Sequence, residues 1–251
     1  ILELSNKLEV YEEIPELLSV SLGAAETSLL NLTSAYASFV NGGIKIKPNL
    51  ISRIQDRRGK TIFKIENKKC IGCDKYLNNS KVYPTIEYEN KRVFSKETAY
   101  QMTSILEGAV ERGTAKKLRD LKVPLAGKTG TTNKNYDAWF IGFSSNLVVG
   151  VYIGFDNPKS LGKYETGSKA ALPIFKEFVK NSLFKEDFKE FEIPEGIYLT
   201  SLNYDTGLKA SFGEKNTIIE ALKAKDINNI DNNELISINS YDKLIKYRQF
   251  Y

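Results

Sequence analysis

Residues 128 to 131 are the part of the chain best equipped for chemistry. Lys128, Thr129, Gly130 and Thr131 combine an ammonium group, two hydroxyls and a residue without a side chain. In a strand, alternation places Lys128 and Gly130 on one face and the threonines on the other, and the glycine lets a ligand backbone approach closely. The ammonium and hydroxyl groups can bind a carboxylate, and the Thr131 amide can stabilise an oxyanion. The tetrad therefore indicates acyl transfer on a peptide that ends in a free carboxylate.

The absence of histidine limits the chemistry that can accompany this tetrad. It excludes Ser-His-Asp and Cys-His mechanisms, and it removes histidine-based metal sites. A serine nucleophile would have to use a lysine as its base. A P-loop is excluded as well, because the first glycine of that motif is missing before Lys128.

Cys70 and Cys73 form a Cys-x-x-Cys pair, which is compatible with a redox site, half of a zinc site or a small disulfide. The chain has no third cysteine to complete a zinc site, so we expect no metal. A thioredoxin-like site would need a βαβ context, which the surrounding sequence lacks. We favour a structural disulfide in an oxidising compartment, with free thiols as the alternative.

The net charge of +5 raises the question of an anionic partner. Only seven of the 36 basic residues are arginine, whereas phosphate recognition favours the arginine fork. The excess of lysine, isoleucine and asparagine is typical of drift in an AT-rich genome. We therefore expect no nucleic-acid partner.

The ends and the hydropathy of the chain bear on its origin. No window approaches the run of about 20 apolar residues that spans a membrane. The sequence begins with Ile1 instead of methionine, and no secretory signal follows. We expect these residues to be the C-terminal part of a longer protein.

Hydrophobic periodicity and turn residues predict an alternation of helices and antiparallel strands. We expect helices at 2–8, 31–40 (capped by Thr27), 95–113, 170–184 and 216–224, a hairpin at 50–65, strands at 124–128, 138–143, 147–155 and 193–202, and irregular structure at 66–94. This order indicates an α+β fold. We assign residues 1–190 to one domain, 191–224 to a small β-leaning extension and 225–251 to a polar tail.

Around the tetrad, the sequence resembles the transpeptidase domain of class A penicillin-binding proteins of the 1A type. Lys-Thr-Gly is one of three signatures of penicillin-binding proteins and class A β-lactamases. The other resembling blocks, in order, are Ser21–Glu26, Ala35–Gly43, Val110–Thr114, Gly127–Asn133, Asp137–Gly142, Val149–Asn157, Glu165–Gly167 and Ala171–Phe175. The resemblance implies an antiparallel sheet flanked by helices, incomplete at the N-terminus and without a cofactor.

The resemblance also implies roles for the tetrad. Lys128 would assist the catalytic hydroxyl network electrostatically, and Thr129 and Thr131 would hold the D-alanine or β-lactam carboxylate beside Gly130. The Thr131 amide would be one of two oxyanion donors. Asp137 and Trp139 are expected to shape the neighbouring strand instead of contacting substrate.

The two remaining family signatures, Ser-x-x-Lys and Ser-x-Asn, should precede the tetrad, and residues 1–127 contain neither. Comparable patterns occur only after it, and we interpret them as helix-end and turn residues. They are Ser182-Leu-Phe-Lys185, Ser144-Ser-Asn146, Ser201-Leu-Asn203 and Ser237-Ile-Asn239. We therefore expect the isolated chain to be catalytically inert.

The leading interpretation is the C-terminal part of a peptidoglycan D,D-transpeptidase that works through an acyl-serine and is acylated by β-lactams. An inert binding or docking module from a split or decayed gene is the alternative, and a stand-alone serine β-lactamase is disfavoured by the extension after residue 190. The resemblance implies the peptidoglycan stem peptide and β-lactams as partners. It also implies the periplasmic face of the bacterial inner membrane, reached through an N-terminal anchor that these residues lack.

Overall fold

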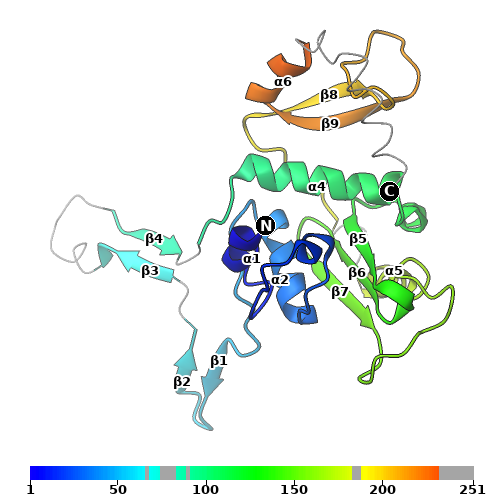
Figure 1. Ribbon diagram of the computed structural model, residues 1–251. Coiled ribbons are helices and arrows are strands. Elements are labelled where there is room, and N and C mark those ends of the chain that lie inside the picture. Colours follow the sequence, from blue (N-terminus) through cyan, green and yellow to red (C-terminus); the bar gives the residue numbers. More distant parts are fainter. Residues whose placement is uncertain (66–67, 74–82, 89–90, 183–187, 232–251) are drawn as a thin grey trace.

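The centre of the fold is a three-stranded antiparallel sheet in the order β5-β6-β7 (Figure 1). Its strands are β5 (Ala126–Thr131), β6 (Ala138–Phe143) and β7 (Val148–Ile153). Aromatic and β-branched residues favour extended structure in β6 and β7. A tight turn joins β6 to β7, where the Ser144 amide donates to the Leu147 carbonyl at 2.9 Å. The computed structural model describes all residues except 66–67, 74–82, 89–90, 183–187 and 232–251.

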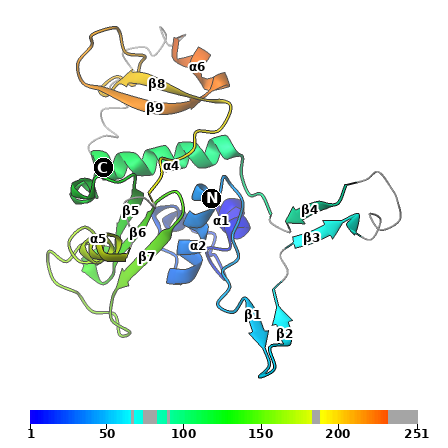
Figure 2. The same cartoon turned by 180° about the vertical axis from the view of Figure 1, so that it is seen from behind.

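Helix α5 (Ala171–Ser182) covers one face of this sheet (Figure 2). Phe140 of β6 and Phe175 of α5 are fully buried and pack edge to face, with ring centroids 4.8 Å apart. Val149 and Val151 of β7 add to the same cluster. This face holds the larger apolar core of the molecule.

Helices α2 (Leu29–Val40) and α4 (Lys96–Glu111) pack on the opposite face. Tyr36 of α2 and Leu106 of α4 pack in the same cluster as Phe143 of β6. Helix α1 (Leu2–Leu8) lies beside α2, and the short 3-10 helix η1 (Leu18–Leu22) precedes it. The sheet is therefore covered by helices on both faces.

Side-chain caps fix the starts of α2 and α4. The Ser95 hydroxyl accepts from the Thr98 amide at 3.3 Å at the start of α4. At α2 the cap is Ser28, whose hydroxyl accepts from the Asn31 amide at 3.0 Å. The prediction of Thr27 as this cap was wrong, because its hydroxyl donates to the Val10 carbonyl instead.

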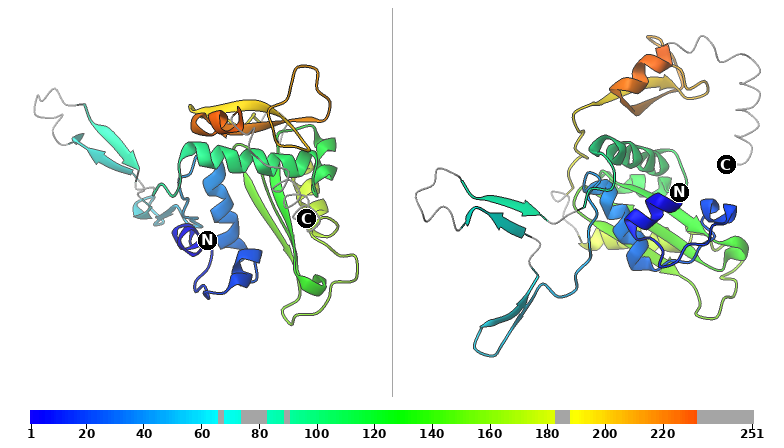
Figure 3. Two further views of the ribbon diagram at one scale, coloured as in Figure 1. Left: turned by 45° about the horizontal axis from the view of Figure 1, so that its top comes forward. Right: turned by 60° about the vertical axis from the view of Figure 1, so that its left-hand side comes forward.

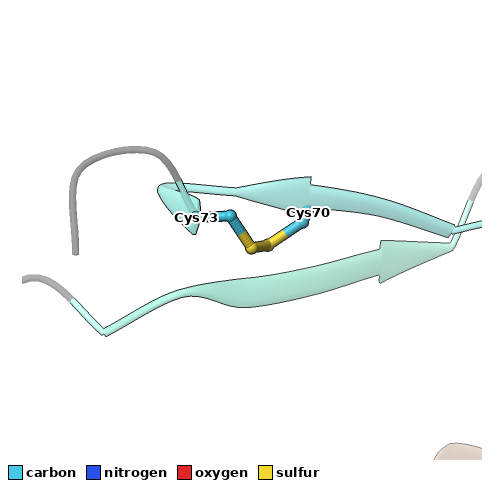
Figure 4. The surroundings of a disulfide bond; sticks show 2 residues. All are labelled: Cys70 and Cys73. Atoms are coloured by element: carbon cyan, nitrogen blue, oxygen red, sulfur yellow. A yellow bond between two sulfur atoms is a disulfide. The ribbon is translucent and has the colours of Figure 1, made fainter. Parts of the chain in front are cut away.

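Two hairpins extend from the body between α2 and α4 (Figures 1 and 3). The predicted hairpin at 50–65 is confirmed as β1 (Arg53–Gln55) and β2 (Thr61–Lys64). The irregular structure predicted for 66–94 was wrong in part, since β3 (Lys68–Ile71) pairs with β4 (Thr85–Tyr88). Each strand has only four residues, too few for a clear local signal, so pairing between distant residues decides their structure. A disulfide joins Cys70 to Cys73 on this second hairpin (Figure 4).

A further two-stranded sheet lies beside α4, on the side away from the central sheet (Figure 1). It pairs β8 (Ile197–Asn203) with β9 (Thr217–Lys223). The helix predicted at 216–224 was therefore wrong. Thr217, Ile218 and Ile219 are β-branched, which favours extended structure, and they lie opposite residues 203, 202 and 201 of β8. Helix α6 (Ala224–Asp231) occupies the start of the predicted tail, and residues 232–251 lie outside the described part.

The α+β class, with an antiparallel sheet flanked by helices, is confirmed. The predicted helices at 2–8 and 95–113 and the strand at 138–143 are found with bounds that agree within about two residues. The short 3-10 helices η2 (Lys116–Leu121) and η3 (Asn133–Asn135) flank β5 in the chain. Within the described residues, no helix has the length and apolar character to cross a membrane.

Candidate functional site

Strand β5 carries the whole tetrad and lies at an edge of the central sheet. The Thr132 amide donates to the Asp137 carbonyl at 3.2 Å, just beyond the strand end. Along a strand of an antiparallel pair, backbone amides alternately point toward the partner strand and away from it. The amides of Lys128 and Gly130 therefore point toward β6. The backbone groups of Thr129 and Thr131 are therefore directed to the open edge. This geometry makes them available to an extended peptide.

The tetrad side chains leave β5 on both faces, as alternation requires. Gly130 lies opposite Trp139, and a Cβ at position 130 would stand 3.0 Å from the Trp139 Cβ. Lys128 is on the same face as Gly130, and its Nζ donates to the Thr129 carbonyl oxygen at 3.0 Å. That carbonyl is directed to the open edge, so the ammonium group lies at the edge too.

The hydroxyls of Thr129 and Thr131 are each held by a different segment. Thr129 Oγ1 lies 2.9 Å from Thr114 Oγ1, which follows α4. Thr131 Oγ1 accepts a hydrogen bond from the Gly167 amide, which precedes α5, at 3.0 Å. The segment after α4 and the segment before α5 therefore both contact the tetrad strand. Thr114 and Gly167 lie in the resembling blocks, but no role for them could be inferred from the sequence.

The turn after β5 is built by hydrogen bonds around Asp137. Its amide donates to the Thr132 hydroxyl at 2.8 Å, and its carboxylate accepts from the Tyr152 hydroxyl at 3.0 Å. Partial burial and the bond to this carboxylate raise the pKa of Tyr152. The Tyr152 ring packs against Trp139 with centroids 4.6 Å apart. In this arrangement, Asp137 and Trp139 support the strands beside the tetrad.

The serine patterns downstream of the tetrad lie in turns, strands or helix ends. The Ser144 hydroxyl donates to Asn146 Oδ1 at 2.8 Å in the β6–β7 turn. Ser201 lies in β8 and Ser182 ends α5. Ser160-Leu-Gly-Lys163 and Ser240-Tyr-Asp-Lys243 have the Ser-x-x-Lys spacing as well. The Ser160 hydroxyl accepts from the Gly162 amide at 3.2 Å and closes a turn.

Three of these patterns cannot be placed completely, because Lys185 and residues 237–243 lie outside the described part. The Ser144 and Ser160 hydroxyls bond to Asn146 and to the Gly162 amide, and not to the lysine ammonium group that activation by lysine would require. Among the described residues, no group of three histidine, cysteine, aspartate or glutamate side chains could hold a metal ion. The described chemistry of this site is that of hydroxyls, an ammonium group and edge amides.

Comparison with known proteins identifies the class to which this site belongs. The family described as penicillin binding protein transpeptidase domain matches residues 13–180, which include the tetrad and most of both helical layers. The chain belongs to this family. The predicted resemblance is therefore confirmed.

Within the family, the curated relatives are 1A-type proteins. Penicillin-binding protein 1A of Rickettsia felis is 35% identical over 250 residues, covering 98% of this chain and 31% of the relative. This chain thus spans about a third of the length of that relative. The crystal structure of Penicillin-Binding Protein 1A from Haemophilus influenzae has a TM-score of 0.69 at 30% identity, covering 87% of this chain and 35% of that one.

A more distant solved structure extends the fold comparison. The PonA1 protein from Mycobacterium tuberculosis, in complex with penicillin V, has a TM-score of 0.54 at 18% identity. It covers 77% of this chain and 51% of that chain. At this identity the likeness concerns the fold alone.

Proposed function

We propose that this chain supplies the substrate-binding wall of a serine D,D-transpeptidase that cross-links peptidoglycan stem peptides. The observation that carries the proposal is the tetrad on an edge strand, with its ammonium group and outward amides at one open edge. An extended peptide pairs with such an edge through its backbone. Membership of the transpeptidase family supports the same reading.

Each tetrad residue has a role in this proposal. Thr129 and Thr131 donate hydroxyl hydrogen bonds to the carboxylate of the terminal D-alanine, and Gly130 leaves room for the peptide backbone. The Lys128 ammonium lies at the edge, where its charge stabilises the anionic groups of the reaction. The Thr131 amide stabilises the oxyanion of the tetrahedral intermediate.

The reaction requires a serine from outside residues 1–127 of this chain. The serine oxygen bonds to the carbonyl carbon of the penultimate D-alanine, and its proton passes to a base. Collapse of the intermediate breaks the amide bond, and D-alanine leaves with a proton on its amine. An amine of another stem peptide then attacks the acyl-serine and restores the serine hydroxyl. A β-lactam acylates the same serine by opening its ring.

Membership of the transpeptidase family supports a proposal for the cellular setting. We propose that the protein acts at the periplasmic face of the bacterial inner membrane, where its stem-peptide substrate lies. An N-terminal anchor outside these residues would hold it there. The oxidising periplasm is also the setting in which the Cys70–Cys73 disulfide persists.

Labelling with a fluorescent penicillin tests the proposal. We expect the complete gene product to be labelled covalently and residues 1–251 alone to remain unlabelled. Lys128→Ala should slow labelling of the complete product about 100-fold, the cost typical of losing one electrostatic donor. Lys180→Ala, an exposed lysine of α5, is the matched control and should leave the rate unchanged.

Two outcomes would contradict the proposal in different ways. Stable covalent labelling of the isolated chain would show that it carries its own nucleophile. Failure of the complete product to react would favour the alternative, an inert docking module. Mass spectrometry of the labelled peptide identifies the residue that reacts.

A further inference from the structure

We propose that Gly167 is a positioning residue whose backbone amide orients the Thr131 hydroxyl as a donor to the substrate carboxylate. The inference rests on the proposed function and deepens it. It starts from the 3.0 Å hydrogen bond between the Gly167 amide and Thr131 Oγ1. No role for Gly167 follows from the tetrad itself.

The direction of this bond is fixed by chemistry. A backbone N–H can only donate, so the Thr131 oxygen is the acceptor and its own proton is left for another partner. A carboxylate accepts only, and it needs such a donor. Thr129 differs, because either hydroxyl can donate in its contact with Thr114. The structure therefore fixes Thr131, and not Thr129, as a donor.

Close backbone packing explains why residue 167 is glycine. A Cβ at this position would stand 2.5 Å from the carbonyl oxygens of both Gly130 and Trp139. Those atoms belong to the paired strands β5 and β6, which cannot yield as a flexible side chain would. Only glycine brings its amide onto the strand at this point.

The segment around Gly167 is itself held firmly. Its carbonyl accepts from the Leu172 amide at 2.9 Å, and the Ala170 amide donates to the Thr166 carbonyl at 2.8 Å. These bonds join the segment to the start of α5, whose buried face anchors it to the sheet. The Thr131 hydroxyl is thus oriented by the core instead of by a mobile loop.

The inference predicts discrimination between charged and neutral ligands. A hydroxyl that donates to a charged carboxylate makes a stronger hydrogen bond than one that donates to a neutral ester. Loss of the Gly167 contact should weaken recognition of the carboxylate and leave the β-lactam ring chemistry intact. A merely structural role would affect both ligands alike.

The experiment compares acylation of the complete gene product by benzylpenicillin and by its methyl ester. Gly167→Ala should lower the second-order rate constant for the acid about 10-fold and that for the ester less than about 3-fold. In a Thr131→Val background, Gly167→Ala should add little, because both changes remove the same interaction. Thr131→Ser should retain the preference for the acid, and Ser168→Ala is the neighbouring control.

A second variant removes the donor without adding a side chain. Glycolic acid introduced at position 167 by nonsense suppression replaces the N–H with an ester oxygen, and it should reproduce the selective loss if Gly167→Ala fails to fold. Equal losses for acid and ester in the glycolic-acid variant, or full additivity of that variant with Thr131→Val, would overturn the inference and leave the proposed function intact. Failure of the unaltered protein to react with either compound would refute the proposed function and this inference with it.

Discussion

The central sheet and the hairpin β1–β2 have the same local pairing but opposite environments. In each, a phenylalanine lies opposite a β-branched residue on the next strand, Phe140 opposite Val151 and Phe63 opposite Ile54. Phe140 is 0% exposed beneath α5, whereas Phe63 is 46% exposed. Every residue of β1 and β2 is exposed.

The difference shows that strand pairing alone does not give a precise site. The tetrad strand is held by helices on both faces of its sheet and by partners for both threonine hydroxyls. The hairpin is held mainly by its own ladder and by Asp56, whose carboxylate accepts from the Arg58 and Lys60 amides. A two-stranded hairpin of this kind is marginally stable in isolation. Substitutions should therefore lower the free energy of unfolding strongly in the central sheet and only slightly in the hairpin β1–β2.

Phe140→Ala gives the largest expected effect. Removing this buried ring leaves a cavity beside Phe175 and should lower the free energy of unfolding by about 3–5 kcal/mol. The matched hairpin variant, Phe63→Ala, should cost less than about 1 kcal/mol, because its ring is half exposed. Urea denaturation followed by circular dichroism measures both. Similar losses for the two variants would show that burial of Phe140 beneath α5 contributes no more stability than the half-exposed position of Phe63.

Glu107 of α4 should make stability depend on pH. Burial, with help from the nearby Glu190 and Glu111 carboxylates, raises the pKa of Glu107 from 4.5 to about 7. Between these values the unfolded chain releases the proton and the folded chain keeps it, so the free energy of unfolding falls as pH rises. Allowing for partial exposure, the loss is about 1–2 kcal/mol.

Glu107→Gln should flatten this dependence between about pH 4.5 and 7. Denaturation curves at several pH values measure the slope, with Glu13→Gln, an exposed carboxyl, as the control. An unchanged slope in Glu107→Gln would show that Glu107 does not titrate in this window.

Ser95→Ala tests the start of α4. Loss of the cap to the Thr98 amide should cost about 1 kcal/mol of unfolding free energy. Ser52→Ala, just before the exposed hairpin, should change it by less than about 0.5 kcal/mol. Thermal melts of the two variants, recorded together, compare body and hairpin with the same chemical change. Equal shifts would argue against a capping role for Ser95.

The smallest effect is expected from removing the disulfide. Cys70 and Cys73 are three residues apart on an exposed hairpin. Replacing both with serine should therefore change the free energy of unfolding by less than about 0.5 kcal/mol. Hydrogen exchange of β3 and β4 should rise in the same variant. A large loss of global stability would mean that this hairpin contributes to the body.

The sequence predicted the elements whose pattern is local. The helix at 96–111 has both a cap and an apolar face, and the strands on either side of Ser144–Asn146 are short apolar runs joined by a turn. The prediction was wrong for β9. Residues 217–223 have a helix-like pattern by themselves, and their extended structure depends on pairing with β8 across an intervening loop. Long-range pairing of this kind overrides local propensity.

The same limit applies to the site. The tetrad could be found from residue types alone, and alternation predicted which side chains share a face. The partners Thr114 and Gly167 could not be assigned, because their contacts depend on how α4 and α5 pack on the sheet. The role of Gly167 in particular depends on its distance to backbone atoms of two strands. No local sequence signal reports such a distance.

The interface between α4 and the sheet β8–β9 differs from the apolar cores on the two faces of the central sheet. Polar contacts between described residues cross it: Gln101 donates to the Ala221 carbonyl at 3.1 Å, Lys223 donates to the Thr98 hydroxyl at 2.7 Å, and Arg112 pairs with Glu220 at 2.7 Å. A cleft of about 350 Å³ between Met102, Ile105 and Leu202 remains beside them. An interface made of polar contacts beside an unfilled cleft is less closely packed than a protein core, so its two sides need not match closely in shape. Substitutions on this side of α4 should therefore be tolerated more readily than substitutions on the side that packs against the tetrad strand, so sequence variation should concentrate at the interface with β8–β9.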